Sequence, residues 1–241
     1  MVLSPPQPKS NFNQYLELTK PRLALGNLLV AGAAFIFGSP EVIDWNAFAF
    51  MFLGLWCVIG SACVFNNIYD RGIDAKMERT RSRALVTGII AKTSAMLFGT
   101  ALLMIGIGLL SATNIFALGA AAVGWATYVL WYTPLKHRSS LALYVGAVSG
   151  ATPPVVGYAA AAGMLDWYAA GLFVILYLWQ LPHFLAIARY RFDEYAAANV
   201  PLAVMRPTSD TQKLRARKIF YASLVVLVAV SILLILQRWV R

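Results

Sequence analysis

Three side chains with oxygen ligands, Asn66, Asp70 and Asp74, follow one another at intervals of four residues at the end of a long apolar segment. On an α-helix this spacing puts all three on one face. Magnesium prefers hard oxygen ligands, and proteins usually bind it through one or two carboxylates together with phosphate oxygens. The spacing therefore predicts a divalent-cation site in which Asp70 and Asp74 carry the charge.

Arginines come directly after these carboxylates, at positions 79, 81 and 83. A guanidinium group binds phosphate oxygens through paired hydrogen bonds. Carboxylates beside arginines at the end of an apolar segment predict a metal–diphosphate site at a membrane surface. The side chains that we assign to the diphosphate are those of Asn67, Arg79, Arg81, Arg83, Lys136 and Arg138.

The composition is that of a membrane protein. Of the 241 residues, 60% are hydrophobic and 12% are charged, and the mean hydropathy is +0.67, whereas a soluble domain would carry roughly a quarter charged residues. The formal net charge of +10 is compatible with nucleic-acid binding. However, the basic residues lie in loops between apolar runs rather than along one solvated face. We therefore expect the lipid bilayer, and no nucleic acid, as a partner.

Seven apolar segments predict an all-α, polytopic transmembrane helical bundle. No linker or change of composition separates a second domain, so residues 1–241 are expected to form one domain. The first segment is expected to begin near Leu16, and the fifth, rich in Gly and Ala and interrupted by Pro153 and Pro154, to lie inside the bundle. The segments are Leu23–Phe37, Trp45–Phe65, Ile89–Leu110, Ile115–Trp131, Leu141–Ala162, Trp167–Ile187 and Ile219–Leu236.

Basic residues are unevenly distributed among the loops. The amino-terminal segment and the loops near residues 66–88, 132–140 and 188–218 contain 17 of the 20 Lys and Arg residues, whereas the three other loops contain none. The positive-inside rule places the amino terminus and these three basic loops in the cytoplasm. Residues that are far apart in the sequence can therefore converge on one site at one face of the bundle.

The second basic loop follows a tyrosine at the end of a span. Lys136 can bind a phosphate oxygen through its ammonium group, and Arg138 can bind two through its planar guanidinium group. Basic residues that only fix the orientation of the protein in the membrane explain the same cluster equally well. The phenol face of Tyr132 can stabilise a nearby cation, which matters if the chemistry passes through a carbocation.

The third basic loop and the span before it add further candidates. His183 lies near the cytoplasmic end of the sixth span, where ionisable groups are functional candidates by default. Imidazole can ligate iron or shuttle protons; the alternative is a hydrogen bond to a neighbouring helix. Asp193 and Glu194 can complete a second metal site, or they can simply offset the charges of Arg189 and Arg191.

Together these motifs resemble the UbiA superfamily of intramembrane prenyltransferases. Residues 66–74 match its Asn-x-x-x-Asp-x-x-x-Asp motif, residues 77–83 match its Met-x-Arg-Thr-x-x-Arg continuation, and Tyr132 with Lys136 matches its Tyr-x-x-x-Lys element. Within the superfamily, the chain is similar to the protohaem IX farnesyltransferases, or haem O synthases. Three stretches favour this branch, at residues 16–22, 150–154 and 179–184.

The resemblance implies transfer of a farnesyl group from farnesyl diphosphate to the vinyl group of haem B, giving haem O and diphosphate. It implies Mg²⁺ as the cofactor and the bacterial plasma (inner) membrane as the location, with haem A synthase or oxidase assembly factors as further partners. It also implies that His183 and His137 contact the haem, without deciding which of them meets the iron. The residues to which it gives catalytic roles are Asp70, Asp74, Tyr132 and Lys136, and those that it gives to metal ions are Asn66, Asp70, Asp74, Asp193 and Glu194.

Several positions depart from the family pattern. Ala84 and His137 stand where the family usually has a proline and a basic residue. Asp193-Glu194-Tyr195 replaces the second Asp-x-x-x-Asp motif, which makes metal ligation there a weaker expectation. The family fold has nine helices and this chain supplies seven, so the domain is expected to be short at its carboxyl terminus.

Two other functions remain open at the level of sequence. An aromatic prenyltransferase of quinone or chlorophyll synthesis would use the same diphosphate chemistry with a phenolic acceptor, which needs no iron ligand such as His183. A transporter or a non-catalytic haem-binding membrane protein is the alternative from another class. Carriers, however, rarely concentrate carboxylates and arginines on one surface.

Overall fold

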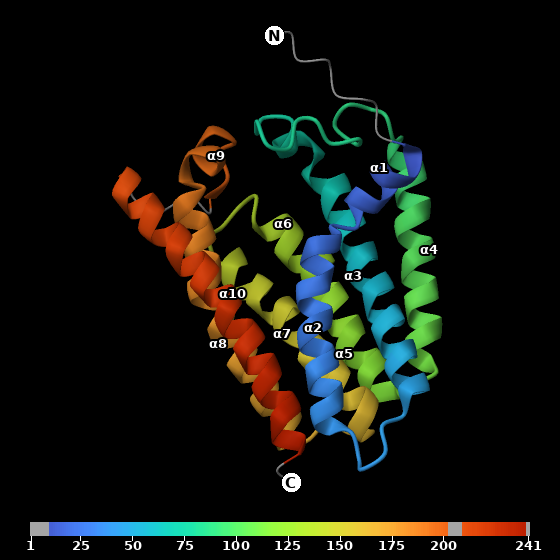
Figure 1. The fold of residues 1–241 in the computed structure, drawn as a ribbon. Helices are drawn as coiled ribbons and strands as arrows, with labels where there is room; N and C mark the ends of the chain where they lie inside the picture. Colours follow the sequence, from blue (N-terminus) through green and yellow to red (C-terminus); the bar gives the residue numbers. More distant parts are fainter. Residues whose placement is uncertain (1–9, 202–208, 240–241) are drawn as a thin grey trace, which may run out of the picture.

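The protein is an all-helical bundle (Figure 1), as the sequence predicts. The structure is a computed structural model, and it describes residues 10–201 and 209–239, among which no β-strand occurs. The helices are α1 (Asn11–Leu18), α2 (Pro21–Gly38), α3 (Trp45–Asp74), α4 (Lys92–Ser111), α5 (Ile115–Ala126), η1 (Thr127–Tyr132), α6 (Thr133–Leu135), α7 (Ala142–Ala162), α8 (Trp167–Tyr190), α9 (Phe192–Ala197) and α10 (Asp210–Arg238).

In the described part of the chain, six helical segments are long and apolar enough to cross a membrane, and the chain is a multi-pass membrane protein. Each of the seven segments predicted from the sequence corresponds to a helix of the bundle, and α7 is the one outside this set of six. Its Ser, Thr, Gly and Pro residues lower its hydropathy. The six segments are Pro21–Gly38, Trp45–Asp74, Lys92–Ser111, Ile115–Leu135, Trp167–Tyr190 and Asp210–Arg238.

Helix α7 runs through the interior of the bundle and packs against α2, α5 and α8. Its buried residues are mostly Ala, Val, Gly and Pro. At Gly157 a Cβ atom would overlap the backbone of Ala31 in α2. Small residues therefore permit the close contact between α7 and its neighbours, as the composition of this segment predicts.

Pro153 and Pro154 do not interrupt α7, in contrast to the expectation from the sequence. Pro153 has no N–H to donate to the carbonyl of Ser149. Instead, the Thr152 hydroxyl donates a hydrogen bond of 2.8 Å to that carbonyl. The helix continues because a neighbouring hydroxyl satisfies the freed backbone group.

The first span begins later than the sequence predicts. Residues Asn11–Leu18 form the separate helix α1, and α2 starts at Pro21. Between them Lys20 has a φ of 51°, in the left-handed region, which turns the chain. Proline is favoured at the first position of a helix because the N–H that it lacks would have no partner there. The turn directs the Lys20 side chain toward α3.

The fourth span contains a π-helical segment, η1, between α5 and α6. Pro134 cannot donate a hydrogen bond to the carbonyl of Leu130, and the Thr133 hydroxyl donates one of 2.8 Å to the carbonyl of Tyr128. Widened turns of this kind are rare and often occur at functional sites. This one ends at Tyr132, one turn before Lys136.

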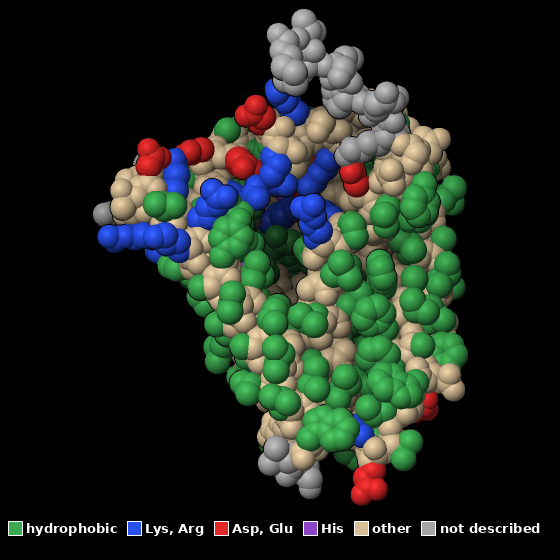
Figure 2. Space-filling view, in the orientation of Figure 1, with side chains coloured by type: hydrophobic (Ala, Val, Ile, Leu, Met, Phe, Trp, Pro, Cys, Tyr) green, Lys and Arg blue, Asp and Glu red, His purple; other side chains and the backbone are tan. Residues whose placement is uncertain are grey.

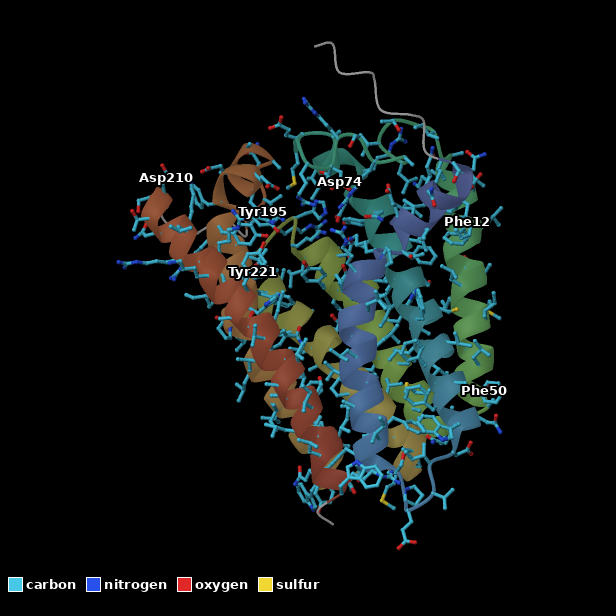
Figure 3. All side chains as sticks on the ribbon, in the orientation of Figure 1. Phe12, Phe50, Asp74, Tyr195, Asp210 and Tyr221 are labelled. Atoms are coloured by element: carbon cyan, nitrogen blue, oxygen red, sulfur yellow. The ribbon has the colours of Figure 1, made fainter. Side chains whose placement is uncertain are left out.

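The connections between helices gather at two ends of the bundle (Figure 1). One end, here termed the polar end, holds α1, residues 75–91, α6 and α9, and the α2–α3, α4–α5 and α7–α8 connections lie at the other. Figure 3 places Asp74, Tyr195 and Asp210 at the polar end and Phe50 toward the opposite one. The three basic loops of the sequence therefore share one end of the molecule.

Helix α10 is joined to α2 at the end opposite the polar end. The joint is the guanidinium group of Arg238, which donates hydrogen bonds of 2.7–3.3 Å to the carbonyls of Ile36, Ser39, Pro40 and Glu41. A cation is favoured where a helix ends and its carbonyls lack partners. From this joint α2 and α10 diverge toward the polar end (Figure 1).

Candidate functional site

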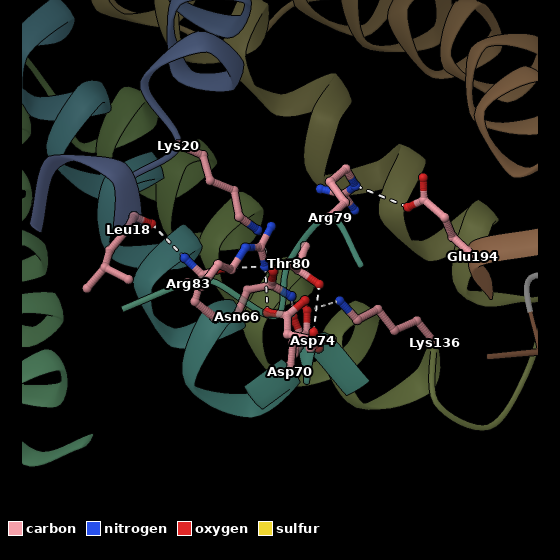
Figure 4. Close-up of polar contacts among 12 residues, drawn as sticks. Leu18, Lys20, Asn66, Asp70, Asp74, Arg79, Thr80, Arg83, Lys136 and Glu194 are labelled. Atoms are coloured by element: carbon pink, nitrogen blue, oxygen red, sulfur yellow. Dashed lines mark hydrogen bonds and ion pairs between the residues drawn. The ribbon is translucent and has the colours of Figure 1, made fainter. Parts of the chain in front are cut away.

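The last turns of α3 carry the acidic face. Asn66, Asp70 and Asp74 are all buried, with exposed fractions of 1%, 4% and 4%. Carboxylates near the C-terminus of a helix are unfavourable with its dipole, so these two need cationic partners. Figure 4 shows basic side chains reaching them from other segments of the chain.

Asp70 is paired with two residues of the second basic loop. One of its carboxylate oxygens accepts a hydrogen bond from Lys136 Nζ, and the other lies 3.0 Å from His137 Nε2. Lys136 is itself buried. The pairing therefore holds residues 136 and 137 against α3. It also places an imidazole at the acidic face, at the position where the family usually has a basic residue.

Arg83 joins two residues of α3 to each other. Its Nη1 lies 2.5 Å from Asp74 Oδ2 and 3.2 Å from Asn67 Oδ1. Asn67 Nδ2 donates a hydrogen bond of 2.9 Å to the carbonyl of Leu18, and the Thr80 hydroxyl donates one of 2.9 Å to the backbone carbonyl of Asp74. The loop after α3 is thus folded back over the end of its own helix.

Lys20 belongs to this network, although the sequence reasoning assigned it no role. Its Nζ donates a hydrogen bond of 2.7 Å to Asn66 Oδ1, and Asn66 Nδ2 donates one of 3.1 Å to Thr133 Oγ1. Burial lowers the pKa of Lys20 below its usual value, and the nearby charges of Lys136 and Arg83 lower it further. The signal in the sequence was a lysine directly before the proline that begins an apolar span.

The network has more positive than negative charge. Lys20, Arg83 and Lys136 are three cationic side chains in contact with the acidic face, which holds the two carboxylates of Asp70 and Asp74. Positive charge gathered in a partly enclosed setting attracts anions. The arrangement therefore suits a polyvalent anion that arrives with a divalent cation.

Tyr132 lies next to the charged network. Lys136 Nζ is 5.5 Å from the centroid of its ring, and the ring of Tyr128 stacks on it at a centroid distance of 5.0 Å. The ring also packs against Gly146 of α7, where a Cβ atom would come within 2.9 Å of it. The phenol face is thus already placed beside a cation.

Helix α9 carries a separate set of ion pairs, of which Figure 4 shows the one between Arg79 and Glu194. Glu194 lies 3.1 Å from Arg79 Nε and 3.2 Å from Arg191 Nη1, and Asp193 lies 2.6 Å from Lys213 Nζ of α10. No cluster of three or more His, Cys, Asp or Glu side chains occurs among the described residues. The carboxylates of α9 therefore do not form one group with those of α3.

Two of the arginines assigned to the diphosphate lie apart from the network. The Arg81 side chain is 67% exposed and is 3.8 Å from Glu78. Arg138 is exposed, and within the described residues its side chain makes no hydrogen bond or ion pair. The structure thus brings Arg83 and Lys136 onto the acidic face and pairs Arg79 with Glu194 of α9. Arg81 and Arg138 remain at the surface.

His183 lies at the contact between α8 and α10. Its ring is flanked by Trp179 and Phe220, with centroid distances of 4.9 Å to each, and its Nδ1 is 2.7 Å from Ser223 Oγ. The Ser223 hydroxyl donates its own hydrogen to the carbonyl of Phe220 at 2.6 Å. We therefore assign the proton of the neutral imidazole to Nδ1, which leaves a lone pair on Nε2.

The ligands of α3 fit magnesium. Two carboxylates and an amide oxygen on one helix face are hard oxygen donors, which suit magnesium better than zinc or copper. The same face presents them to the cationic side chains that would receive a phosphate. Metal ligands and anion ligands are thus adjacent.

The surface is hollowed beside the network. Figure 2 shows an opening between Lys and Arg side chains at the polar end, with hydrophobic side chains deeper in it. Further from the polar end, Val30 of α2, Ala151 of α7 and Leu176 of α8 form a buried apolar cluster, here termed the floor cluster, against which Leu227 of α10 packs. The hollow has a charged mouth and an apolar interior.

The fold and the site define a polytopic membrane protein with a buried network of carboxylates and cations at one end of its bundle. The chain belongs to the UbiA prenyltransferase family, whose sequence model matches residues 27–240.

Relatives named protoheme IX farnesyltransferase are similar over most of the chain. One from Marinomonas sp. (strain MWYL1) is 44% identical over 193 residues, which cover 79% of this chain and 65% of the relative. One from Protochlamydia amoebophila (strain UWE25) is 40% identical over 204 residues, which cover 84% and 72%. This chain therefore spans roughly two thirds of the length of these relatives.

Solved structures share the fold. A UbiA homolog from Archaeoglobus fulgidus bound to GPP and Mg²⁺ has a TM-score of 0.69 and 17% sequence identity, and the match covers 94% of this chain and 85% of that one. A UbiA homolog from Aeropyrum pernix K1 has a TM-score of 0.67 and 18% identity, covering 86% and 77%. These likenesses confirm the predicted UbiA-like helical fold.

Proposed function

We propose that the protein transfers the farnesyl group of farnesyl diphosphate to the vinyl group of haem B, releasing diphosphate and giving haem O. The observation that carries the proposal is the 40–44% identity to relatives named protoheme IX farnesyltransferase. The buried carboxylates, their cationic partners and the adjoining apolar hollow supply what such a reaction needs. In this proposal residues 1–241 act as a single domain.

Asn66, Asp70 and Asp74 are the residues that would hold magnesium beside the diphosphate. When bound, the ion supplies Lewis-acid stabilisation of the departing diphosphate. The binding of GPP and Mg²⁺ by the Archaeoglobus fulgidus homolog supports this assignment, because that protein has the same fold. A second ion at Asp193 and Glu194 is the less supported part of the proposal, because these two carboxylates have different partners: Asp193 pairs with Lys213 of α10, and Glu194 pairs with Arg79 and Arg191.

Cationic side chains bind the diphosphate oxygens and stabilise the leaving group as the allylic C–O bond breaks. Lys136 and Arg83 are the principal ones, because both already lie at the acidic face. Hydrogen bonds from charged donors are the strong ones, and they gain strength as negative charge develops on the leaving group. Further contacts are assigned to Lys20, Asn67, Arg79, Arg81 and Arg138.

Tyr132 stabilises the allylic cation through its ring face. The ring lies beside Lys136, so the carbon that loses the diphosphate would lie next to it as the bond breaks. The quadrupole of an aromatic ring attracts a cation at its face. The apolar hollow next to it keeps water from the cation until the vinyl group reacts.

Haem B occupies the apolar hollow, with its carboxylates toward the charged mouth. His183 ligates the iron through Nε2, because its Nδ1–H donates a hydrogen bond to Ser223 Oγ and leaves the lone pair on Nε2. His137 faces Asp70 and packs edge-on against Tyr69 at a centroid distance of 5.0 Å. It would meet a haem carboxylate at the mouth rather than the iron.

We place the polar end at the cytoplasmic face of the bacterial plasma (inner) membrane, because the basic loops gather there. Haem A synthase or an oxidase assembly factor is the partner that would receive the product.

The test is an enzyme assay with membranes that contain the protein. Haem B, farnesyl diphosphate and Mg²⁺ are incubated with them, and haem O is sought by chromatography and mass spectrometry. Membranes carrying Asp70→Asn together with Asp74→Asn measure the background, and EDTA tests the need for the metal. Formation of haem O by the wild-type protein alone is the expected result. Prenylation of a phenolic acceptor in place of haem B would replace this function by that of an aromatic prenyltransferase.

A further inference from the structure

Gln180 is the one buried residue of α8 with a polar side chain, and it is 4% exposed. It lies in the middle of a membrane-spanning helix. A carboxamide there costs free energy unless its hydrogen bonds are made, because hydrocarbon offers none. Its position therefore requires an explanation.

The Gln180 carboxamide has no hydrogen-bond partner among the described residues. It can donate two hydrogen bonds and accept two. In α8, no side-chain oxygen or nitrogen is both fully enclosed and without a partner. The amide of Gln180 is therefore not sealed in protein, and the small accessible part of this residue includes its polar atoms.

Gly150 of α7 makes room for this side chain. A Cβ atom at Gly150 would overlap the Gln180 carboxamide, meeting Oε1 most closely and coming within 2.7 Å of Cδ and Nε2. Gly146 lies one turn earlier on the same face of α7, and a Cβ there would meet the ring of Tyr132. Tyr132 and Gln180 therefore line the same wall of α7, with Tyr132 nearer the polar end.

Gln180 lies one helical turn from the floor cluster, on the side of the polar end. Leu176, one turn further from the polar end on α8, belongs to the floor cluster, as does Ala151 next to Gly150. The carboxamide is thus followed by apolar side chains on the side away from the polar end.

A second amide lies at the same level on α2. Asn27 is one turn above Val30 of the floor cluster, and it shares a helix face with the fully buried Ala34, yet it is only half-buried itself. Its Nδ2 donates a hydrogen bond of 2.9 Å to the carbonyl of Leu23 of its own helix, and its Oδ1 has no partner in the described part of the chain.

We propose that the Gln180 carboxamide binds an oxygen atom of the acceptor substrate at the floor of the hollow. This inference rests on the proposed function. A prenyl chain is hydrocarbon and would leave the amide without a partner, so the amide serves the acceptor. In the orientation proposed above, with the carboxylates at the mouth, the oxygen that haem B offers at this depth is a ligand on the iron; haem B bound the other way round would offer a propionate carboxylate. Each can exchange a hydrogen bond with the carboxamide.

The test compares haem binding and stability in two variants of the purified protein. Gln180→Leu keeps the size of the side chain and removes the amide. Its dissociation constant for haem B should rise about tenfold, the effect of one lost hydrogen bond, with inhibition by pyrophosphate unchanged. Without haem, its melting temperature should stay the same or rise, because an unmet polar group is replaced by hydrocarbon.

The matched control is Thr152→Val, a change of similar size at a buried residue of α7. The Thr152 hydroxyl already satisfies the Ser149 carbonyl. This variant should therefore show the opposite pattern, a lower melting temperature with unchanged affinity for haem B. Gly150→Ala should displace the carboxamide and weaken haem binding in the same direction as Gln180→Leu.

Modified porphyrins distinguish the two sources of the oxygen. If Gln180 binds a propionate, the difference between wild type and Gln180→Leu should disappear with the dimethyl ester of haem B. If it binds an oxygen on the iron, the difference should persist with the ester and disappear with metal-free protoporphyrin IX.

Equal haem affinity in the wild type and in Gln180→Leu would overturn the inference and leave farnesyl transfer intact. A fall in both affinity and melting temperature would also overturn it, because that is the behaviour of a residue that supports the fold. Absence of haem binding and of haem O formation in the wild-type protein would instead remove the proposed function itself.

Discussion

Asp70 and Asp74 each form an ion pair, with Lys136 and Arg83 respectively. Replacing one residue of such a pair leaves the other as a buried charge without a partner. Asp70→Asn and Asp74→Asn should each reduce the turnover of farnesyl diphosphate by about a hundredfold, the scale of losing one electrostatic contact to a developing charge. Turnover is measured as haem O formed per protein in membranes with equal amounts of inserted protein.

Glu78→Gln is the control for these two variants. It removes a carboxylate from the loop directly after α3, but the Glu78 side chain is 89% exposed, and its one ion pair among the described residues is with Arg81. Near-normal turnover in both Asp variants would end the assignment of the metal to α3.

Arg83 and Lys136 should act on binding of the diphosphate. Arg83→Ala and Lys136→Ala should each raise the KM for farnesyl diphosphate about tenfold and weaken inhibition by pyrophosphate, because a charged hydrogen bond of this kind contributes roughly 1.5–3 kcal/mol. Lys76→Ala removes a charge from an exposed position of the loop that carries Arg83. It should change neither the KM for farnesyl diphosphate nor the inhibition by pyrophosphate. Unchanged pyrophosphate inhibition in both variants would make these residues determinants of topology only.

His183 should act on the acceptor and not on the diphosphate. His183→Ala should weaken haem B binding and shift the Soret band, because the imidazole would be lost as an axial ligand, while pyrophosphate inhibition survives. Phe184→Leu, a change at the next residue with no loss of a ligand atom, is the control. Retention of the wild-type spectrum and activity by His183→Ala would remove the residue-level reason for preferring haem to a phenolic acceptor.

Local spacing predicts the acidic face well and its partners poorly. The four-residue interval of Asn66, Asp70 and Asp74 determines their common face because a helix repeats every 3.6 residues. The contact of Lys20 with Asn66 joins residues far apart in the sequence. It depends on the left-handed backbone conformation of Lys20 before Pro21, which the hydrophobic periodicity of the sequence does not predict.

At the scale of helices, the joint between α2 and α10 can be tested directly. Arg238→Ala removes hydrogen bonds to four carbonyls. It should lower the free energy of unfolding by about 2 kcal/mol, because charged hydrogen bonds are strong but these are partly open to water. Thermal unfolding in detergent measures the effect. Arg215→Ala, at an exposed position of the same helix, should leave the melting temperature unchanged.

Apolar length predicts the helices, and the chemistry of proline explains most differences. The predicted segments all correspond to helices because crossing a bilayer requires about 20 apolar residues with internal hydrogen bonds. The continuity of α7 through Pro153 depends on the Thr152 hydroxyl, and the π-helical turn at Tyr132 accompanies Pro134. Both depend on which neighbour satisfies a freed carbonyl, and hydropathy carries no information about that.

For the whole molecule, the prediction concerns orientation. Lys76→Cys lies at the polar end, and Val42→Cys lies in the α2–α3 connection at the opposite end, where Val42 is 81% exposed. In intact bacterial cells, a membrane-impermeant maleimide should label Val42→Cys only, because the basic loops face the cytoplasm. The wild-type protein controls for Cys57 and Cys63. Labelling of Lys76→Cys alone would reverse the orientation.

The joint at Arg238 also has a mechanical consequence. Helices α2 and α10 are held together at this end and diverge from it, and α10, which is bonded to α8 through Ser223, is about 44 Å long with its 29 residues. A small rotation at the joint is multiplied along such a lever, so the largest displacement occurs at the charged mouth. Bilayer thickness changes the tilt of membrane helices. A thinner or thicker membrane should therefore alter the width of the mouth before it alters any other dimension of the bundle.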